Sequence, residues 1–332
     1  MIRIPKKWPV VVLSMAVVAA LAGCSGGTPA NPTGKAQATT LTQNQAGASS
    51  STGNATGDMK MPALNQAPVP MKMVRNGNQV TIDMTTQQTE IEIADGVTYH
   101  AWTFNGTVPG PVITVQQGDD VTLNLHNIDT TMPHSIDLHA ALVAPDKAFV
   151  EVMPGQTKTV RFTAKVPGVY MYHCATPPML LHIGNGMYGA IVVVPKGQPA
   201  PTYTIVQSEF YQNGDYNQML NGRPEYVVFN GKANQYIDKP LTAKVGQPVS
   251  IAFVNAGPNE FSAFHIVGTV LSDVMPSGSP NTHLHNLQTY TVAPGDGALF
   301  KVTFEEPGTY TMVTHAMADA SKGAMGKIVV TP

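Results

Sequence analysis

The stretch FNGTVPGPVITVQQGDDVTLNLHN, from Phe104 to Asn127, has a counterpart in FNGKANQYIDKPLTAKVGQPVSIAFVN, from Phe229 to Asn255. Both begin with the triplet Phe-Asn-Gly, and both end in an alternating apolar and polar run that closes on asparagine. Two further pairs follow in the same order, PGVYMYHC with PGTYTMVTH and GMYGAIVVVP with GAMGKIVVTP. Repeats that keep their order indicate two copies of one domain.

Each copy is made of short alternating runs, such as VTLNLHN and TVRFTAKV, which Gly and Pro interrupt at roughly ten-residue intervals. This pattern is typical of an all-β chain, and it predicts two tandem Greek-key β-sandwiches over residues 74–197 and 198–332. Charged residues make up only 12% of the chain, and the net charge is -2. A nucleic-acid partner is therefore not expected, because it requires a basic face.

The first 73 residues differ in composition from the repeats. MIRIPKKWPVVVLSMAVVAALAGC has basic residues before an apolar run, which predicts an export signal over residues 1–24. LAGC resembles the lipobox of bacterial lipoproteins, which implies cleavage before Cys24 and acylation of its thiol. An uncleaved membrane anchor is the alternative. Residues 25–73 have almost no large apolar side chains and predict a disordered tether. We expect an exported protein that is lipid-anchored to a bacterial membrane.

Lipidation of Cys24 would leave Cys174 as the single free thiol, within YHCATPPMLLHIGNGMYG. Exported proteins usually use their cysteines in disulfides, so an unpaired thiol is expected to serve a chemical purpose. Two imidazoles, one thiolate and a weak thioether form the ligand set of a blue-copper centre. The sequence supplies such a set in four residues, namely His134, Cys174, His182 and Met187.

The alternation of side chains along a strand divides these residues between two faces. His173 and Cys174 are adjacent, so they point in opposite directions if both are extended. His134 and His139 are five residues apart and also face opposite sides, whereas Asp137 shares the side of His139. This predicts two metal sites, back to back, joined through the His173–Cys174 peptide. A β-bulge in either stretch would invalidate the prediction.

The second of these sites has only two histidines from the first copy, and a metal with an open position commonly takes three protein ligands. The second copy offers His265 and His315. Cys174 aligns with Thr314, and His315 follows it, so His315 is expected to face away from its own domain and to be the third ligand. Two unrelated surface histidines are the alternative.

Residues 80–332 resemble the copper-containing nitrite reductases in PHSIDLHAA, YHCATPPMLLHIGNGMYGAIVV, VVFNG, SAFHIVG and VTHAMADASKGAMG. The resemblance implies cupredoxin-like domains with two coppers per chain. The implied type 1 ligands are His134, Cys174, His182 and Met187, and the implied type 2 ligands are His139, His173 and His315. Asp137 and His265 match the residues that handle protons over the type 2 copper. A homotrimer is also implied, in which His315 reaches the site of a neighbouring chain.

The implied reaction is the one-electron reduction of nitrite to nitric oxide. No Cys-x-x-Cys-His haem segment follows the second copy, so we expect a separate electron donor, either a small cupredoxin or a cytochrome c. Two features depart from many members. The segment after His315 is one residue shorter, and Val267 stands where isoleucine is common.

Three other interpretations remain open. A laccase-like two-domain multicopper oxidase would need several His-x-His pairs, and the sequence has only His283–His285. A non-catalytic electron-transfer cupredoxin would need neither a second domain nor the outward histidines. A structural or adhesion lipoprotein would leave the copper sites empty.

Overall fold

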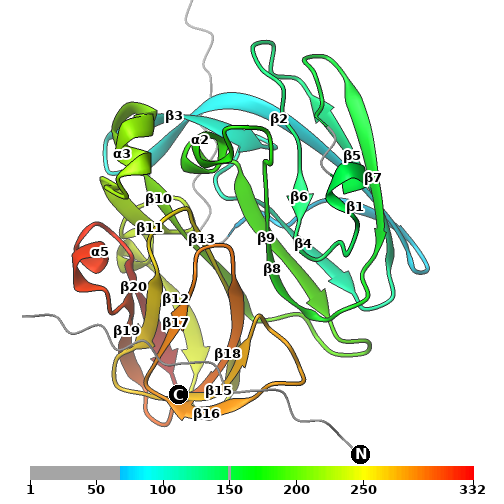
Figure 1. Cartoon of the computed structure of the whole chain (residues 1–332). Coiled ribbons are helices and arrows are strands. Elements are labelled where there is room, and N and C mark those ends of the chain that lie inside the picture. Colours follow the sequence, from blue (N-terminus) through cyan, green and yellow to red (C-terminus); the bar gives the residue numbers. More distant parts are fainter. Residues whose placement is uncertain (1–67, 149–150) are drawn as a thin grey trace, which may run out of the picture. The chain divides into compact units, whose positions relative to one another are not determined.

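The computed structural model describes residues 68–148 and 151–332 (Figure 1). Cys24, the predicted signal and nearly all of the predicted tether lie outside these residues. The described part is built mainly from strands, and its helices are short, so the all-β prediction is confirmed. Within the described ranges, no helix has the length and apolar character that a membrane crossing requires.

The strands of the first copy form two sheets. One has the order β1-β2-β5-β7, with β3 paired to β2, and the other has the order β4-β9-β8-β6. The bounds in the first sheet are β1 Met73–Asn76, β2 Gln79–Ala94, β3 Val97–Phe104, β5 Asp120–Asn127 and β7 Thr157–Thr163. The bounds in the second are β4 Gly110–Gln116, β6 Asp137–Leu138, β8 Gly168–His173 and β9 Tyr188–Val194.

The strands of the second copy also form two sheets, ordered β11-β10-β13-β18-β15-β16 and β12-β20-β19-β14-β17. The first has β10 Tyr203–Phe210, β11 Tyr226–Phe229, β13 Pro248–Gly257, β15 Leu271–Pro276, β16 Leu284–Leu287 and β18 Gly297–Thr303. The second has β12 Lys239–Lys244, β14 Ser262–Ile266, β17 Thr289–Val292, β19 Gly308–Thr314 and β20 Met325–Thr331. The boundary expected between residues 197 and 198 falls in the segment between β9 and β10.

The repeated Phe-Asn-Gly triplet forms the same turn in both copies. Asn105 and Gly106 have φ of 55° and 74°, and Asn230 and Gly231 have φ of 54° and 86°. Two consecutive residues with positive φ are what a type I′ hairpin turn requires, and Asn-Gly is the pair that adopts it at least cost. The residues that flank each turn pair as a short antiparallel bridge.

Alternation along the strands builds the two cores. In β5 the side chains of Val121, Leu123 and Leu125 are buried, while the intervening positions are partly exposed. They join a cluster that also contains Cys174 and Met187. Burying each such aliphatic side chain stabilises the fold by about 1.5–3 kcal/mol. The first core therefore encloses the expected blue-copper residues within close-packed apolar side chains.

Short helices fill the connections. They are α1 Pro145–Ala148, α2 Met179–Gly184, the 3-10 turn Gln212–Gly214, α3 Tyr216–Leu220, α4 Gln235–Asp238 and α5 Met317–Ser321. α2 lies between Cys174 and Met187 in the chain, and α3 of the second copy packs against it (Figure 1). A Cβ added to Gly184 of α2 would lie 2.7 Å from Sδ of Met219, so glycine permits this close approach.

Candidate metal centres

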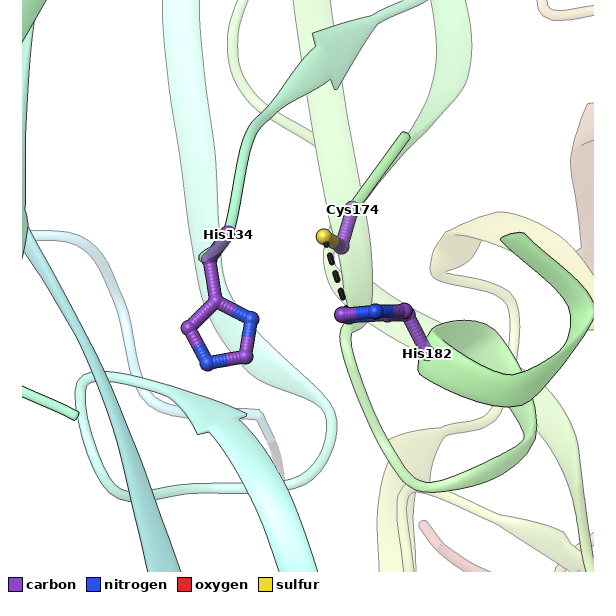
Figure 2. A group of neighbouring side chains, drawn as sticks. All are labelled: His134, Cys174 and His182. Carbon is purple, nitrogen blue, oxygen red and sulfur yellow. Dashed lines mark hydrogen bonds between the residues drawn. The ribbon is translucent and has the colours of Figure 1, made fainter. Parts of the chain in front are cut away.

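Three of the expected blue-copper residues converge inside the first sandwich (Figure 2). His134 pairs with Val152 in an isolated bridge, Cys174 follows β8, and His182 lies on α2. One ligand atom from each lies within 4.8 Å of the other two. Sγ of Cys174 is 3.4 Å from Nδ1 of His182, and all three side chains are buried. Two imidazoles and one thiol therefore face a common point.

The hydrogen bonds of His134 leave one nitrogen free for a ligand. Its Nε2 donates to Oδ2 of Asp129 at 2.9 Å, which fixes the proton on that nitrogen. Its Nδ1 is buried and has no hydrogen-bond partner in the described part of the chain. An unpartnered buried polar atom costs about 1–3 kcal/mol. A soft cation coordinated by Nδ1 would remove that cost, so the site fits copper.

Burial sets the protonation of this group. It lowers the pKa of His134, and together with the neighbouring His134 it lowers the pKa of His182 to about 4. Both imidazoles are thus neutral at pH 7, which is the form that binds a metal. Burial also raises the pKa of the Cys174 thiol, although hydrogen bonds from Ser135 and Thr176 oppose this. The thiolate therefore needs a cation beside it.

Asp129 is held as a carboxylate. Burial alone would raise its pKa, but hydrogen bonds outweigh this and lower the pKa to about 2. Its Oδ1 accepts from the N–H and hydroxyl of Thr131, and its Oδ2 accepts from Gln88 and His134. A carboxylate behind a ligating histidine orients the ring and raises its basicity.

Met187, the fourth expected residue of this group, is fully buried in the same core cluster. Its backbone carbonyl accepts from the N–H of Cys174 at 3.0 Å, and its own N–H donates to the carbonyl of His182 at 3.1 Å. These bonds tie the loop that carries Met187 to both neighbouring members of the group. The N–H of Ser135 points at Sγ of Cys174 across 3.4 Å.

A second group forms where β6 pairs with β8, with Asp137 opposite His173. One ligand atom each from Asp137, His139 and His173 lies within 4.8 Å of the others. Nε2 of His139 and Nε2 of His173 are 3.1 Å apart, and Oδ2 of Asp137 lies 3.7 Å and 3.5 Å from them. The structure therefore brings together the three residues that strand alternation placed on one face.

The hydrogen bonds made by Nδ1 of His139 and of His173 indicate what the second group can bind. Nδ1 of His173 donates to the carbonyl of Cys174 at 2.9 Å, and Nδ1 of His139 donates to the carbonyl of Gly295 at 3.2 Å. Both Nε2 atoms then present lone pairs to one another and to Asp137. Burial lowers the pKa of His173, which favours this neutral form. Converging lone pairs and a carboxylate fit a metal cation.

His173 and Cys174 lie on opposite sides of the sheet. Cys174 belongs to the buried cluster inside the first sandwich, whereas Nε2 of His173 meets His139 on the other side. The carbonyl of Cys174 also holds Nδ1 of His173. The two groups are thus adjacent along the backbone and separated by the sheet itself.

His265 and His315 lie together in the second copy but in neither group. His265 is on β14 and His315 follows β19, and their ring centroids are 5.5 Å apart. His315 is exposed, and Nδ1 of His265 donates to the carbonyl of Gln288 at 2.6 Å. A cavity of about 750 Å³ opens beside His265, and Val267 is 49% exposed. Within one chain, His315 does not complete the group at His139.

The second copy keeps the framework of the first group without its ligands. Thr314 stands where the first copy has Cys174, and its hydroxyl accepts from the N–H of Ala263 at 3.0 Å. Its own N–H donates to the carbonyl of Ala324, as Cys174 donates to Met187. A hydroxyl does not replace a thiolate, so residues 198–332, all of which the structure describes, lack a blue-copper ligand set.

Two residues near the first group were missed by sequence reasoning. Asp129 orients His134, and the ring of Trp102 makes edge-on contacts with His182 and His134 at centroid distances of 4.9 Å and 6.4 Å. An aspartate five residues before a histidine has no distinctive spacing. Trp102 lies just before the repeated segment that begins at Phe104, and a lone aromatic residue there carries no ligand signature.

Comparisons with known proteins are consistent with this arrangement. A family model described as multicopper oxidase matches residues 85–198. A copper-containing nitrite reductase of Neisseria meningitidis serogroup A is 38% identical over 269 residues, covering 76% of this chain and 69% of that protein. A copper-containing nitrite reductase of Alcaligenes faecalis is 36% identical over 288 residues, covering 76% of each.

Two solved structures share the fold of this chain. A copper nitrite reductase from Nitrosomonas europaea superposes with a TM-score of 0.73 at 38% identity, covering 76% of this chain and 94% of that one. A multicopper oxidase superposes with a TM-score of 0.72 at 24% identity, covering 81% of this chain and 96% of that one. The second likeness concerns the fold alone.

Proposed function

The chain belongs to the family of copper-containing nitrite reductases, and on that basis we propose that it reduces nitrite to nitric oxide by one electron. The observation that carries the proposal is the pair of metal-binding groups that meet at the His173–Cys174 peptide. A one-electron reduction needs a place to receive the electron and a place to bind the anion. Two groups that share a backbone link supply both.

We assign the groups as the resemblance implied. The type 1 ligands are His134, Cys174, His182 and Met187, and the type 2 ligands are His139, His173 and, from a neighbouring chain, His315. Copper held there would supply one-electron storage at the thiolate and a Lewis acid for nitrite at the open position. The role of the first sandwich is to keep water from the thiolate, because Cys174 and His134 are fully buried.

The remaining work is proton transfer. Nitrite needs two protons to release one oxygen as water, and Asp137 stands beside both histidines of the second group. His265 would be the second proton carrier. It lies with His315 in the second copy, so both would reach the group of a neighbouring chain together. A closed ring of three chains, each in head-to-tail contact with the next, satisfies this requirement.

Other parts of the proposal concern the surroundings. We propose that the electron comes from a separate carrier, a small cupredoxin or a cytochrome c. Cys24 would carry a lipid that holds the exported protein to a bacterial membrane. A laccase-like oxidase is less well supported. In the part of the chain that the structure describes, His, Cys, Asp and Glu side chains form two groups of three that could hold a metal ion. His283 and His285 belong to neither group.

Copper counting and an Asp137→Asn variant test the function. We expect two coppers per chain, and the one bound to the Cys174 thiolate should give the protein its visible colour. The amide introduced by Asp137→Asn would keep the size of the carboxylate but could not carry a proton, so turnover should fall by about 10²–10⁴-fold while both coppers stay bound. Asp146→Asn, at an exposed carboxylate on α1, is the control. Nitrite reduction at the wild-type rate in copper-loaded Asp137→Asn would contradict the assignment.

A further inference from the structure

A cavity of about 330 Å³ opens next to the first metal-binding group. Thr98, His100 and Trp102 alternate along β3 and so present one face of that strand to it. Leu181 of α2 and Asn185 at the end of that helix line another side; both belong to the segment between Cys174 and Met187, here called the ligand loop. None of these residues belongs to the nitrite chemistry proposed above.

Trp102 forms the wall between this cavity and the ligating histidines. Its indole meets the ring of His182 edge-on, with centroids 4.9 Å apart and planes at 66°. It also lies 6.4 Å from the ring of His134. Its backbone N–H donates to the carbonyl of Asn185 at 2.9 Å, which fixes the strand to the ligand loop. The indole of Trp102 therefore lies against the cavity on one side and against the ring of His182 on the other.

The lining describes the molecule that would fit. The volume falls in the range of about 300–1,000 Å³ that is usual for small-molecule sites. The walls offer aromatic rings and the amide of Asn213, whereas the amide of Asn185 is already bonded to Tyr99 and Leu181. Among the described residues, the lining includes neither a carboxylate nor a lysine or arginine. The imidazole of His100 is already bonded to Glu90 and Gln88. A neutral, planar, aromatic molecule with hydroxyl groups matches this combination of walls.

We propose that this cavity binds a small aromatic reductant of the hydroquinone class, as a second electron source beside the protein carrier, and that the ring of Trp102 lies on the path of its electron to the group that contains His182. The inference rests on the proposed function, because the electron is destined for the same metal-binding group. In each step one O–H bond of the reductant breaks, its electron tunnels past the indole of Trp102 to the group that contains His182 without residing on the indole, and the proton leaves to water at the open mouth. One hydroquinone, two nitrites and two protons then give one quinone, two nitric oxides and two waters.

The test uses the full copper-loaded chain, without oxygen or nitrite. Hydroquinone is mixed with the protein at increasing concentration, and the loss of visible colour is followed. Binding in a cavity predicts a rate that saturates, whereas reaction by collision gives a rate that rises linearly. Because nitrite is absent, this result does not depend on whether the protein reduces nitrite.

Substitutions at Trp102 and Thr98 test whether the cavity and the electron path, rather than general stability of the fold, determine the rate. Trp102→Leu should raise the half-saturating hydroquinone concentration about tenfold, equivalent to about 1.4 kcal/mol, which is the size of one lost aromatic pair. It should also slow the saturated rate, while Trp102→Phe restores most of both. Thr98→Trp, at an exposed position, should block the mouth without touching the ligand loop. Tyr226→Leu removes an aromatic ring that does not line this cavity and should change nothing.

Two further measurements test whether Trp102 lies on the electron path or only holds the ring of His182 in position. The visible spectrum and the reduction potential of the coloured site should stay unchanged in Trp102→Leu. The chain has two tryptophans, so the fluorescence difference between wild type and Trp102→Phe isolates Trp102, and hydroquinone should quench it saturably. The proposal is overturned by a linear rate in the wild type, by equal rates in Trp102→Leu, or by a shifted potential in that variant.

Discussion

Replacing Asp129 with asparagine asks whether this carboxylate sets the orientation of the first metal-binding group. Both oxygens of Asp129 accept hydrogen bonds, Oδ1 from Thr131 and Oδ2 from Gln88 and His134 at 2.9 Å each. An amide has an oxygen at one end and N–H donors at the other. Whichever way the amide turns, its NH₂ faces groups that are themselves donors. With the NH₂ toward His134, the ring loses the partner that keeps its proton on Nε2 and its Nδ1 free. With the NH₂ toward Thr131, the oxygen left for His134 is uncharged and a weaker acceptor.

The magnitude follows from the bond that is lost. A hydrogen bond to a charged group contributes about 1.5–3 kcal/mol, and each 1.4 kcal/mol is about a tenfold change in affinity. Loss of a partner behind a ligating histidine typically costs about 10–100-fold in metal affinity. We therefore expect Asp129→Asn to weaken copper binding at the coloured site by about 10–100-fold. Competition with a chelator, followed through the visible colour, measures this directly.

The control is Asp83→Asn, because Asp83 also pairs with a histidine, His126, but on the surface. It should leave copper affinity unchanged. Circular dichroism of the copper-free proteins confirms that both variants are folded. A folded Asp129→Asn protein that holds copper within about threefold of wild type would refute the reasoning, since the expected loss is at least tenfold.

Three further predictions concern the thiolate, a buried acid and a repeated glycine. Cys174→Ala should abolish the colour and donor-driven turnover but leave one copper per chain, which metal analysis would show. Burial raises the pKa of Glu209 from 4.5 to about 6. Glu209 therefore favours folding below about pH 4.5, and this contribution, about 2 kcal/mol, is lost as pH rises through 6. Urea unfolding across this range should show the loss in wild type and not in Glu209→Gln. Gly231→Ala should lower the free energy of unfolding by about 3 kcal/mol or more, because its Cβ would lie 2.0 Å from the carbonyl oxygen of Val108 at a φ of 86°. Gly106→Ala, with similar φ but only the end of a flexible side chain nearby, should cost roughly 1–2 kcal/mol. Equal losses in the two glycine variants would contradict the steric argument.

The fold could be predicted because its information is local and repeated. Alternating runs and the Phe-Asn-Gly turns occur twice in the same order, so each copy supports the interpretation of the other. The short helices were not predicted. α2 and α3 are only five to six residues long, and their positions depend on close packing of Gly184 against Met219. Such contacts join segments far apart in the chain and leave no periodic signal.

The grouping of the candidate ligands could also be predicted, for a different reason. A strand fixes the direction of every side chain once one is known, so His173 and Cys174 could be separated on adjacency alone. Asp129 and Trp102 could not be found this way. Asp129 depends on a turn that aims its carboxylate at His134, and Trp102 depends on how β3 crosses the ligand loop. Cys24 lies outside the described residues, and its lipidation remains a prediction.

The adjacency of His173 and Cys174 has a consequence for how such a chain tolerates change. The positions of both groups depend on the register of β8, which ends at His173 and is followed by Cys174. A single inserted or deleted residue in that strand would move the side chains of His173 and Cys174 to the opposite faces of the sheet at once. Length changes between Cys174 and His182, where α2 lies, would displace only one group. A change in loop length is therefore expected to affect only the group that contains Cys174, whereas a shift in the register of β8 would disrupt both groups together. The backbone offers no way to reposition one member of the pair without the other, because the two residues share a peptide bond.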